Sequence, residues 1–169
     1  DFTFANYVEA FKELDFIRTF FNSVLLTVVS VAVIIIFSSL AAYALSRVKG
    51  TLSTVILFLF VAAMLIPFHS VMIPLVTIFG KLEMLNRGGI IFMYLGFGAS
   101  LSIFLYQGAL NSIPRTLDEA ATIDGANKWQ VFWYIIFPML KPITVTVGIL
   151  NTIWIWNDYL LPSLVINAE

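Results

Sequence analysis

Long stretches without a charged residue divide the chain. Residues 19–46, 50–80 and 88–114 contain no Asp, Glu, Lys or Arg. A helix needs roughly 20 apolar residues to cross the hydrocarbon core of a bilayer, and each stretch is longer than that. The pattern therefore predicts three membrane-spanning helices. Their expected ranges are about 20–46, 52–79 and 89–110.

A fourth uncharged stretch, 142–157, lies between Lys141 and Asp158. As a helix it would extend about 25 Å, which is close to the roughly 30 Å of a bilayer core. We therefore predict a fourth span over about 142–161, with Asp158 near an interface and Pro162 ending the helix.

In the first eighteen residues, apolar and polar positions recur with the period of an α-helix. Apolar side chains recur at i, i+3, i+4 and i+7, while Glu9, Lys12 and Glu13 lie off that stripe. We predict an amphipathic helix over 1–18, lying on the membrane surface or against other spans, most simply as a packing helix. Its apolar stripe comprises Phe4, Tyr7, Val8, Phe11 and Leu14.

The second predicted span contains Pro67 and Pro74. Each proline removes a backbone donor and kinks a helix. Within a bilayer, such a break requires protein or water to satisfy the freed carbonyls. His69, between the prolines, either lines a polar pathway or is an ordinary packed or interfacial histidine, and the second reading is favoured for a lone residue.

Small residues cluster in two predicted spans, where they permit close helix packing. In the first span they are Ser38, Ser39, Ala41, Ala42 and Ala44, and in the third Gly96, Gly98 and Gly108.

The composition supports a membrane protein. The chain is 60% hydrophobic and 11% charged, against about 25% charged residues in a soluble domain. A net charge of −1 gives no basic footprint for nucleic acid, and the lack of cysteine excludes disulfides and cysteine-based metal sites. Because the sequence begins at Asp1, we expect it to be part of a longer protein.

A small polar region follows the third span. Pro114 suits a helix start, and Thr116 with Glu119 three residues later matches a capping box. Gly125 can adopt the left-handed conformation that stops the helix. A second, aromatic helix then runs to Pro138. These features alone are compatible with a helix that enters a groove on another protein, but they slightly favour a plain loop between two spans.

The same residues resemble a known motif. Glu119-Ala120-Ala121, then Gly125, Ile135 and Phe137-Pro138, are similar to the EAA motif of binding-protein-dependent ABC importer permeases, with Phe137 where the family has leucine. The resemblance extends over essentially the whole chain and points to the carbohydrate-uptake subfamily, which includes maltose and glycerol-phosphate permeases. It is carried by "NYVEAFKELDFIRTFFNSVLLT", "LAAYALSRVKG", the proline pair, "NSIPRTLDEAA", "IDGA" and "WNDYLLP".

This resemblance implies an all-α polytopic bundle with the type I ABC importer permease fold. Residues 1–169 would form one partial transmembrane domain, with four of the family's usual six spans and without the first and last. The implied function is the permease subunit of an ATP-driven importer in a bacterial or archaeal cytoplasmic membrane. It would translocate a sugar or sugar derivative delivered by an extracytoplasmic binding protein. Further implied partners are a dimer of cytoplasmic ATP-binding subunits, a second permease subunit and the lipid bilayer.

The resemblance also assigns the polar region a role. Its short helix corresponds to the family's coupling helix, which docks in a cleft of the cytoplasmic ATPase. Region 111–138 would then be cytoplasmic, and the helix over 1–18 external. The residues implied in coupling are Glu119, Ala120, Ala121, Asp124, Gly125, Ala126 and Pro138.

The chain lacks the G-x-x-x-x-G-K-[ST] phosphate loop, since Gly80-Lys81 is followed by Leu82. We therefore expect no enzymatic activity and no cofactor on this polypeptide, with ATP hydrolysed by a partner.

Residues at the end of the fourth predicted span have two interpretations. Trp154, Trp156, Asn157 and Asp158 are candidates to stack on and bond a sugar, but tryptophans also mark membrane interfaces, and that reading is favoured. Alternative functions are a permease for a non-sugar solute, an ion-coupled secondary transporter or a structural membrane protein. The secondary transporter would require charged residues within the spans, which the first three stretches lack.

Overall fold

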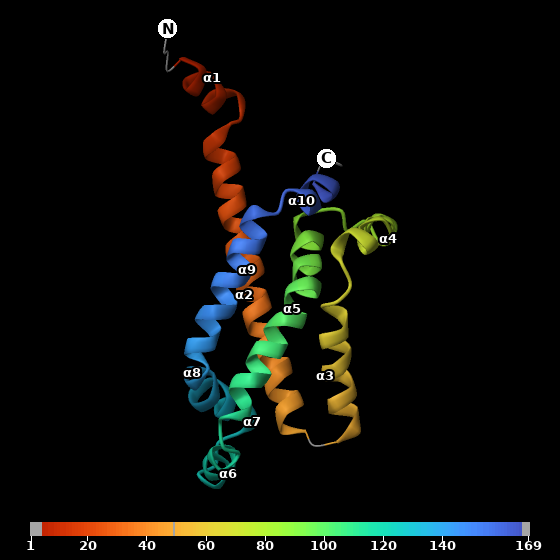
Figure 1. The fold of residues 1–169 in the computed structure, drawn as a ribbon. Coiled ribbons are helices and arrows are strands. Elements are labelled where there is room, and N and C mark those ends of the chain that lie inside the picture. Colours follow the sequence, from red (N-terminus) through yellow and green to blue (C-terminus); the bar gives the residue numbers. More distant parts are fainter. Residues whose placement is uncertain (1–4, 49, 167–169) are drawn as a thin grey trace.

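The computed structural model describes residues 5–48 and 50–166. Every regular element in these ranges is helical, with no strand, as predicted. Figure 1 shows an elongated bundle in which α2 (Phe16–Arg47), α5 (Arg87–Asn111) and α9 (Lys141–Asn157) run alongside one another. The remaining helices are α1 (Ala5–Glu13), α3 (Thr51–Ala63), α4 (Phe68–Lys81), α6 (Thr116–Ile123), α7 (Lys128–Gln130), the π-helix η1 (Val131–Ile136), α8 (Phe137–Met139) and α10 (Leu160–Val165).

Two of these helices are each long and apolar enough to cross a membrane, namely α2 and α5. Two further spans require a bent pair each. The pair α3 and α4 is bent by 104°, and the helical segment Lys128–Met139 is bent by 76° from α9. If each bent pair crosses once, the chain has the four spans that its charge pattern predicts.

The small residues of α2 are buried to different degrees. Ser38, Ser39 and Ala42 are fully buried, whereas Ala41 is half-buried and Ala44 is exposed. Part of the predicted small-residue surface therefore faces solvent or lipid.

Only one of the three glycines that were expected to permit close approach does so. A Cβ on Gly98 would meet Ile34 of α2 and Asn151 of α9, while a Cβ on Gly96 or Gly108 would have nothing within 4 Å. The prediction was wrong for Gly96 and Gly108 because both face away from the packed helices.

The two prolines of the second span behave differently. Pro67 has extended backbone (φ −68°, ψ 137°) and immediately precedes α4, so the break lies there. Pro74 lies inside α4, which continues to Lys81. The helix is therefore not broken at Pro74. His69 lies in the first turn of α4, is exposed, and packs edge-on against the Phe68 ring at 5.9 Å.

The fourth predicted span ends earlier than expected. Helix α9 ends at Asn157, and Pro162 is the third residue of α10 rather than a terminator. A proline in the first turn is tolerated because its missing N–H has no partner there. The Asp158 carboxylate accepts hydrogen bonds from the backbone N–H groups of Leu160 at 3.1 Å and Leu161 at 3.4 Å, which caps α10.

The helix predicted over 1–18 is divided: α1 ends at Glu13, Asp15 has a left-handed conformation (φ 41°), and residues from Phe16 onward belong to α2. Phe11 packs on Phe16 of α2 at 4.8 Å between ring centroids. Tyr7 and Leu14, two members of the apolar stripe, are 76% and 65% exposed. Phe4 and the side chain of Val8 lie outside the described part of the chain.

The helices place the polar region at one end of the molecule. In Figure 1 the end of α2, the start of α3, and helices α6 and α7 lie together at the bottom, while α1, α4 and α10 lie at the top. This arrangement puts the loop after α2 and the region after α5 on one side, as alternating spans require.

Candidate functional site

Helix α6, the eight-residue helix Thr116–Ile123, follows α5 at the end of the bundle. The predicted capping box at its start is wrong. Arg115 precedes the helix in an α-helical conformation (φ −67°, ψ −20°), and no side chain caps it. Thr116 is consequently already inside the first turn. Asp118 and Glu119 do lie in that turn, where the helix dipole favours negative charge.

The end of α6 follows the prediction. Gly125 has φ 89°, a left-handed conformation that L residues with side chains rarely adopt. The Ala126 N–H donates to the Ala121 carbonyl at 2.9 Å, and the Gly125 N–H donates to the Thr122 carbonyl at 3.1 Å. These two bonds form a Schellman motif, which satisfies the last carbonyls of the helix.

A capping box that was not predicted opens the next helix. The Asn127 side-chain oxygen accepts from the N–H groups of Trp129 and Gln130, both at 3.0 Å, and the Asn127 N–H donates to Gln130 Oε1 at 2.8 Å. The spacing of Asn127 and Gln130 was visible in the sequence and matches this motif.

The aromatic helix that follows differs from the expected α-helix. It passes through the π-helix η1, and helical structure continues through Pro138 to Met139. Pro138 therefore does not end the helix. It lies where the π-helix η1 passes directly into α8, and the helical path continues beyond it to Met139. The 76° bend follows at Leu140.

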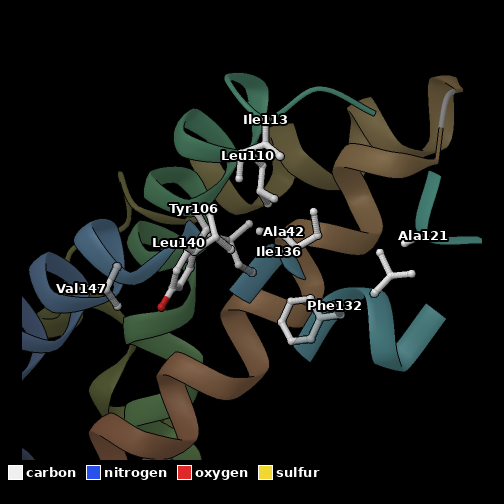
Figure 2. Packing of buried hydrophobic residues seen from close by; sticks show 11 residues of the cluster. Ala42, Tyr106, Leu110, Ile113, Ala121, Phe132, Ile136, Leu140 and Val147 are labelled. Carbon is white, nitrogen blue, oxygen red and sulfur yellow. The ribbon is translucent and has the colours of Figure 1, made fainter. Parts of the chain in front are cut away.

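One face of α6 packs onto its own chain. Ala121 is 7% exposed and belongs to a buried cluster with Phe132, Ile136 and Ala42, against which Leu117 also packs. Figure 2 shows Ala121 at the edge of this cluster. Of the two alanines that the family resemblance implies in coupling, only Ala120 is exposed.

The opposite face of α6 is open. Glu119, Ala120 and Asp124 are exposed, and the Ile123 side chain is 85% exposed. Of the other predicted site residues, Gly125 is exposed at the turn, Ala126 is half-buried, and Pro138 is exposed on α8. An apolar side chain, an acid and a methyl group thus form a narrow surface outside the bundle, which we call the outer face of α6 (Glu119, Ala120 and Ile123).

A polar cluster that the sequence analysis missed connects α6 to α2. The Tyr43 hydroxyl donates to Asp118 Oδ1, and Arg47 Nε donates to the same oxygen at 3.2 Å. Arg47 Nη2 lies 2.9 Å from Asp118 Oδ2, completing an ion pair whose side chains are only 16% and 18% exposed. The Arg47 guanidinium also lies 5.5 Å from the centre of the Tyr43 ring.

Arg115, just before α6, donates hydrogen bonds to the end of α2. Its Nη1 donates to the Arg47 carbonyl at 3.2 Å, and its Nη2 donates to the Ser46 carbonyl. The guanidinium therefore satisfies carbonyls that the last turn of α2 leaves unpaired. The partners are 71 and 68 residues apart in sequence, so no local pattern indicated these pairs.

The candidate sugar-binding residues are used in packing. Trp154 packs edge-on against Tyr94 at 5.5 Å, and Trp156 packs edge-on against Phe20 at 5.8 Å. Asn157 donates to a carbonyl of its own helix at 2.7 Å, and Asp158 accepts from the Tyr94 hydroxyl at 3.0 Å. Trp156 and Asp158 also line a cavity of about 550 Å³.

The described residues contain no cluster of His, Cys, Asp and Glu that could hold a metal ion.

Known proteins resemble this chain in both sequence and fold. It is 56% identical over 162 residues to the probable starch degradation products transport system permease protein AmyC of Thermoanaerobacterium thermosulfurigenes, covering 96% of this chain and 59% of AmyC. It is 40% identical to the multiple sugar-binding transport system permease protein MsmG of Streptococcus mutans, covering 89% of this chain and 55% of MsmG. The chain thus spans less than two thirds of the length of these curated relatives.

The fold is similar to that in the crystal structure of a bacterial ABC transporter involved in the import of the acidic polysaccharide alginate. The TM-score is 0.74 at 32% identity, covering 85% of this chain and 50% of the other. Residues 34–169 match the family described as binding-protein-dependent transport system inner membrane component, and the chain therefore belongs to that family.

Proposed function

We propose that this chain is part of the permease subunit of an ATP-driven importer for a sugar or sugar derivative. The observation that carries the proposal is the outer face of α6, which presents Glu119, Ala120 and an 85% exposed Ile123 beyond the end of the bundle. Family membership supports the import function. The relatives named for starch degradation products and multiple sugars support the substrate class.

The energy for transport would enter through α6. The sequence has no phosphate loop, so ATP hydrolysis is assigned to a partner. Ile123 would bury its side chain in a cleft of that partner, as large anchors do at interface centres. Glu119 would form a charge-assisted bond to a basic residue, and Ala120 would permit close approach. Gly125 and its Schellman motif keep the helix short and rigid.

Closure of the ATP-binding partners would move α6 as a rigid body, and the attached helices would follow. Such a mechanism requires different contacts in inward- and outward-facing states. With α6 on the cytoplasmic side, helices α1, α4 and α10 would face the extracytoplasmic binding protein. The permease would pair with a second permease subunit and two ATP-binding subunits in the cytoplasmic membrane.

Reconstitution tests this function. The full-length permease, purified with its co-expressed neighbours and placed in proteoliposomes, should accumulate sugar only with ATP inside and binding protein outside. Candidate sugars are chosen by thermal-shift screening of the binding protein. Uptake driven by an ion gradient without ATP, or a permease that purifies without any ATP-binding subunit, would contradict the proposal.

A further inference from the structure

We propose that Tyr43, Arg47, Arg115 and Asp118 form a mechanical joint that passes the motion of α6 to α2. We call this group the α2–α6 joint. The inference rests on the proposed function, because it assumes that closure of an ATP-binding partner moves α6. It assigns a positioning role to these four residues, which themselves touch neither ATP nor the transported solute.

Two adjacent acids on α6 have different surroundings. Asp118 directs its carboxylate to Tyr43 and Arg47 of α2, whereas Glu119 is exposed. Consecutive residues of a helix project about 100° apart, so one turn presents one acid to its own chain and the next to a partner. Force applied at Glu119 and Ile123 therefore reaches α2 through a neighbouring side chain of the same turn.

Two arginines make the joint, and each belongs to a different side of it. Arg47 of α2 holds the first turn of α6 through Asp118, and Arg115, just before α6, holds the last carbonyls of α2. Two attachments resist rotation that a single bond would allow. Charge-assisted guanidinium bonds are also directional, so they transmit twisting as well as translation.

The ion pair is partly sheltered from water. Arg47 Nη2 and Asp118 Oδ2 are buried and, among the described residues, have no hydrogen-bond partner beyond their ionic contact with each other. Salt screens a sheltered pair less than an exposed one. Removing either charge would leave the other partly buried without its ionic partner, which is costly. We therefore expect the ion pair to stay formed through the transport cycle.

The joint connects to the helix interface of the bundle. On α2, Ile34 lies against Gly98 of α5, which in turn lies against Asn151 of α9. A displacement of the end of α2 would therefore be felt by both helices. The apolar contacts of α6, through Leu117 and Ala121, lie on the cluster around Phe132. The joint thus gives α6 its polar hold on α2.

The test uses the full-length permease assembled with its ATP-binding subunits, second permease and binding protein in proteoliposomes. The measured quantity is sugar transported per ATP hydrolysed. Asp118→Asn should lower this ratio by about fivefold or more, the lower end of typical coupling between sites. The ATP-binding subunits should still co-purify, because Glu119 and Ile123 are unchanged.

Charge exchange supplies a stricter test. Arg47→Asp and Asp118→Arg should each lower the ratio, and the double variant should recover a substantial part of it. A purely structural role would instead lower the amount of assembled complex while leaving the ratio unchanged. Glu83→Gln serves as a matched control, because Glu83 is an exposed carboxylate that follows α4, and α4 lies at the opposite end of the molecule from α6 (Figure 1).

A wild-type ratio for Asp118→Asn in an assembled complex would overturn the joint. If Asp118→Asn fails to assemble, Arg47→Lys decides, because lysine keeps the charge but not the planar fork. A wild-type ratio for Arg47→Lys would also overturn the joint, and a lowered ratio would support it. Failure of the wild-type complex to bind ATP-binding subunits would refute the proposed function instead, so the two failures are distinguishable.

Discussion

Gly98 of α5 lies directly against Asn151 of α9, and a Cβ on the glycine would come within 2.6 Å of the amide oxygen. The Asn151 amide nitrogen donates to Ser102 Oγ at 3.1 Å and to the Val147 carbonyl at 2.9 Å. Because Asn151 is 5% exposed and bonded to both α5 and its own helix, it cannot easily move aside. The contact therefore fixes how closely the two helices approach.

We predict that Gly98→Ala destabilises the bundle by about 1–3 kcal/mol, the usual cost of overpacking. The measurement is the thermal unfolding midpoint of the full-length permease in detergent. Gly96→Ala is the matched control, because a Cβ there has nothing within 4 Å and the helix gains propensity. Equal midpoints for the two variants would show that the interface relaxes around the added methyl group.

Gly125 yields a prediction about the turn after α6. A Cβ at this position would meet nothing within 4 Å, so a substitution acts only through the left-handed backbone. Gly125→Val should cost about 1–2 kcal/mol in that conformation and reduce sugar-stimulated ATPase activity and uptake. Gly125→Asn should retain most of both, since asparagine tolerates left-handed φ values. Unchanged transport by the valine variant would contradict a requirement for this turn.

Ile123 is predicted to be an anchor for the ATP-binding partner. Ile123→Ser should weaken co-purification of that partner by about 30-fold, which corresponds to a contact of roughly 2 kcal/mol. Ile73→Ser is the control, because Ile73 is 70% exposed on α4 at the other end of the molecule. The idea fails if the Ile123 variant retains the partner as strongly as the control does.

Asn127 is predicted to stabilise the start of the aromatic helix. Asn127→Ala removes the acceptor for two backbone N–H groups and should cost about 1 kcal/mol. Hydrogen exchange at the amides of Trp129 and Gln130 should accelerate about fivefold in the variant. Asn127→Ser should restore slow exchange, because serine is also a good cap. Equally slow exchange in the alanine variant would show that tertiary contacts alone hold this turn.

The spanning helices and the α6 turn were accessible from the sequence for identifiable reasons. Uncharged stretches report membrane helices directly because charge is costly in lipid. Gly125 was identified because a left-handed helix end strongly favours glycine. Each signal is local in the sequence, and each depends on one physical requirement of its own.

The start of α6 shows why other features could not be predicted. Thr116 with Glu119 and Asn127 with Gln130 both match a capping box, but only the second forms one. Arg115 is held by the carbonyls of Ser46 and Arg47, and its backbone is helical. The position that Thr116 would need as a cap is thus already inside the helix. A tertiary contact decided between two equivalent local patterns.

Prolines were misjudged for a related reason. Of the four prolines expected to kink or end a helix, Pro74, Pro138 and Pro162 lie within helices, and Pro67 marks a break. For Pro162 the cost is small, because first-turn N–H groups need no helical partner, whereas Pro74 is the seventh residue of α4 and lies beyond its first turn. Sequence alone does not fix where each turn begins. The ion pair of Arg47 and Asp118 was inaccessible for another reason, since its members belong to different helices 71 positions apart.

Backbone N–H groups stay paired at the bend between α3 and α4. The N–H groups of Met64, Leu65 and Ile66 donate to carbonyls three residues earlier, at 3.2, 3.1 and 3.2 Å. These donors remain paired while the chain turns by 104°. Lipid penalises unpaired backbone donors severely. These three groups would therefore need no hydration if lipid surrounded the bend.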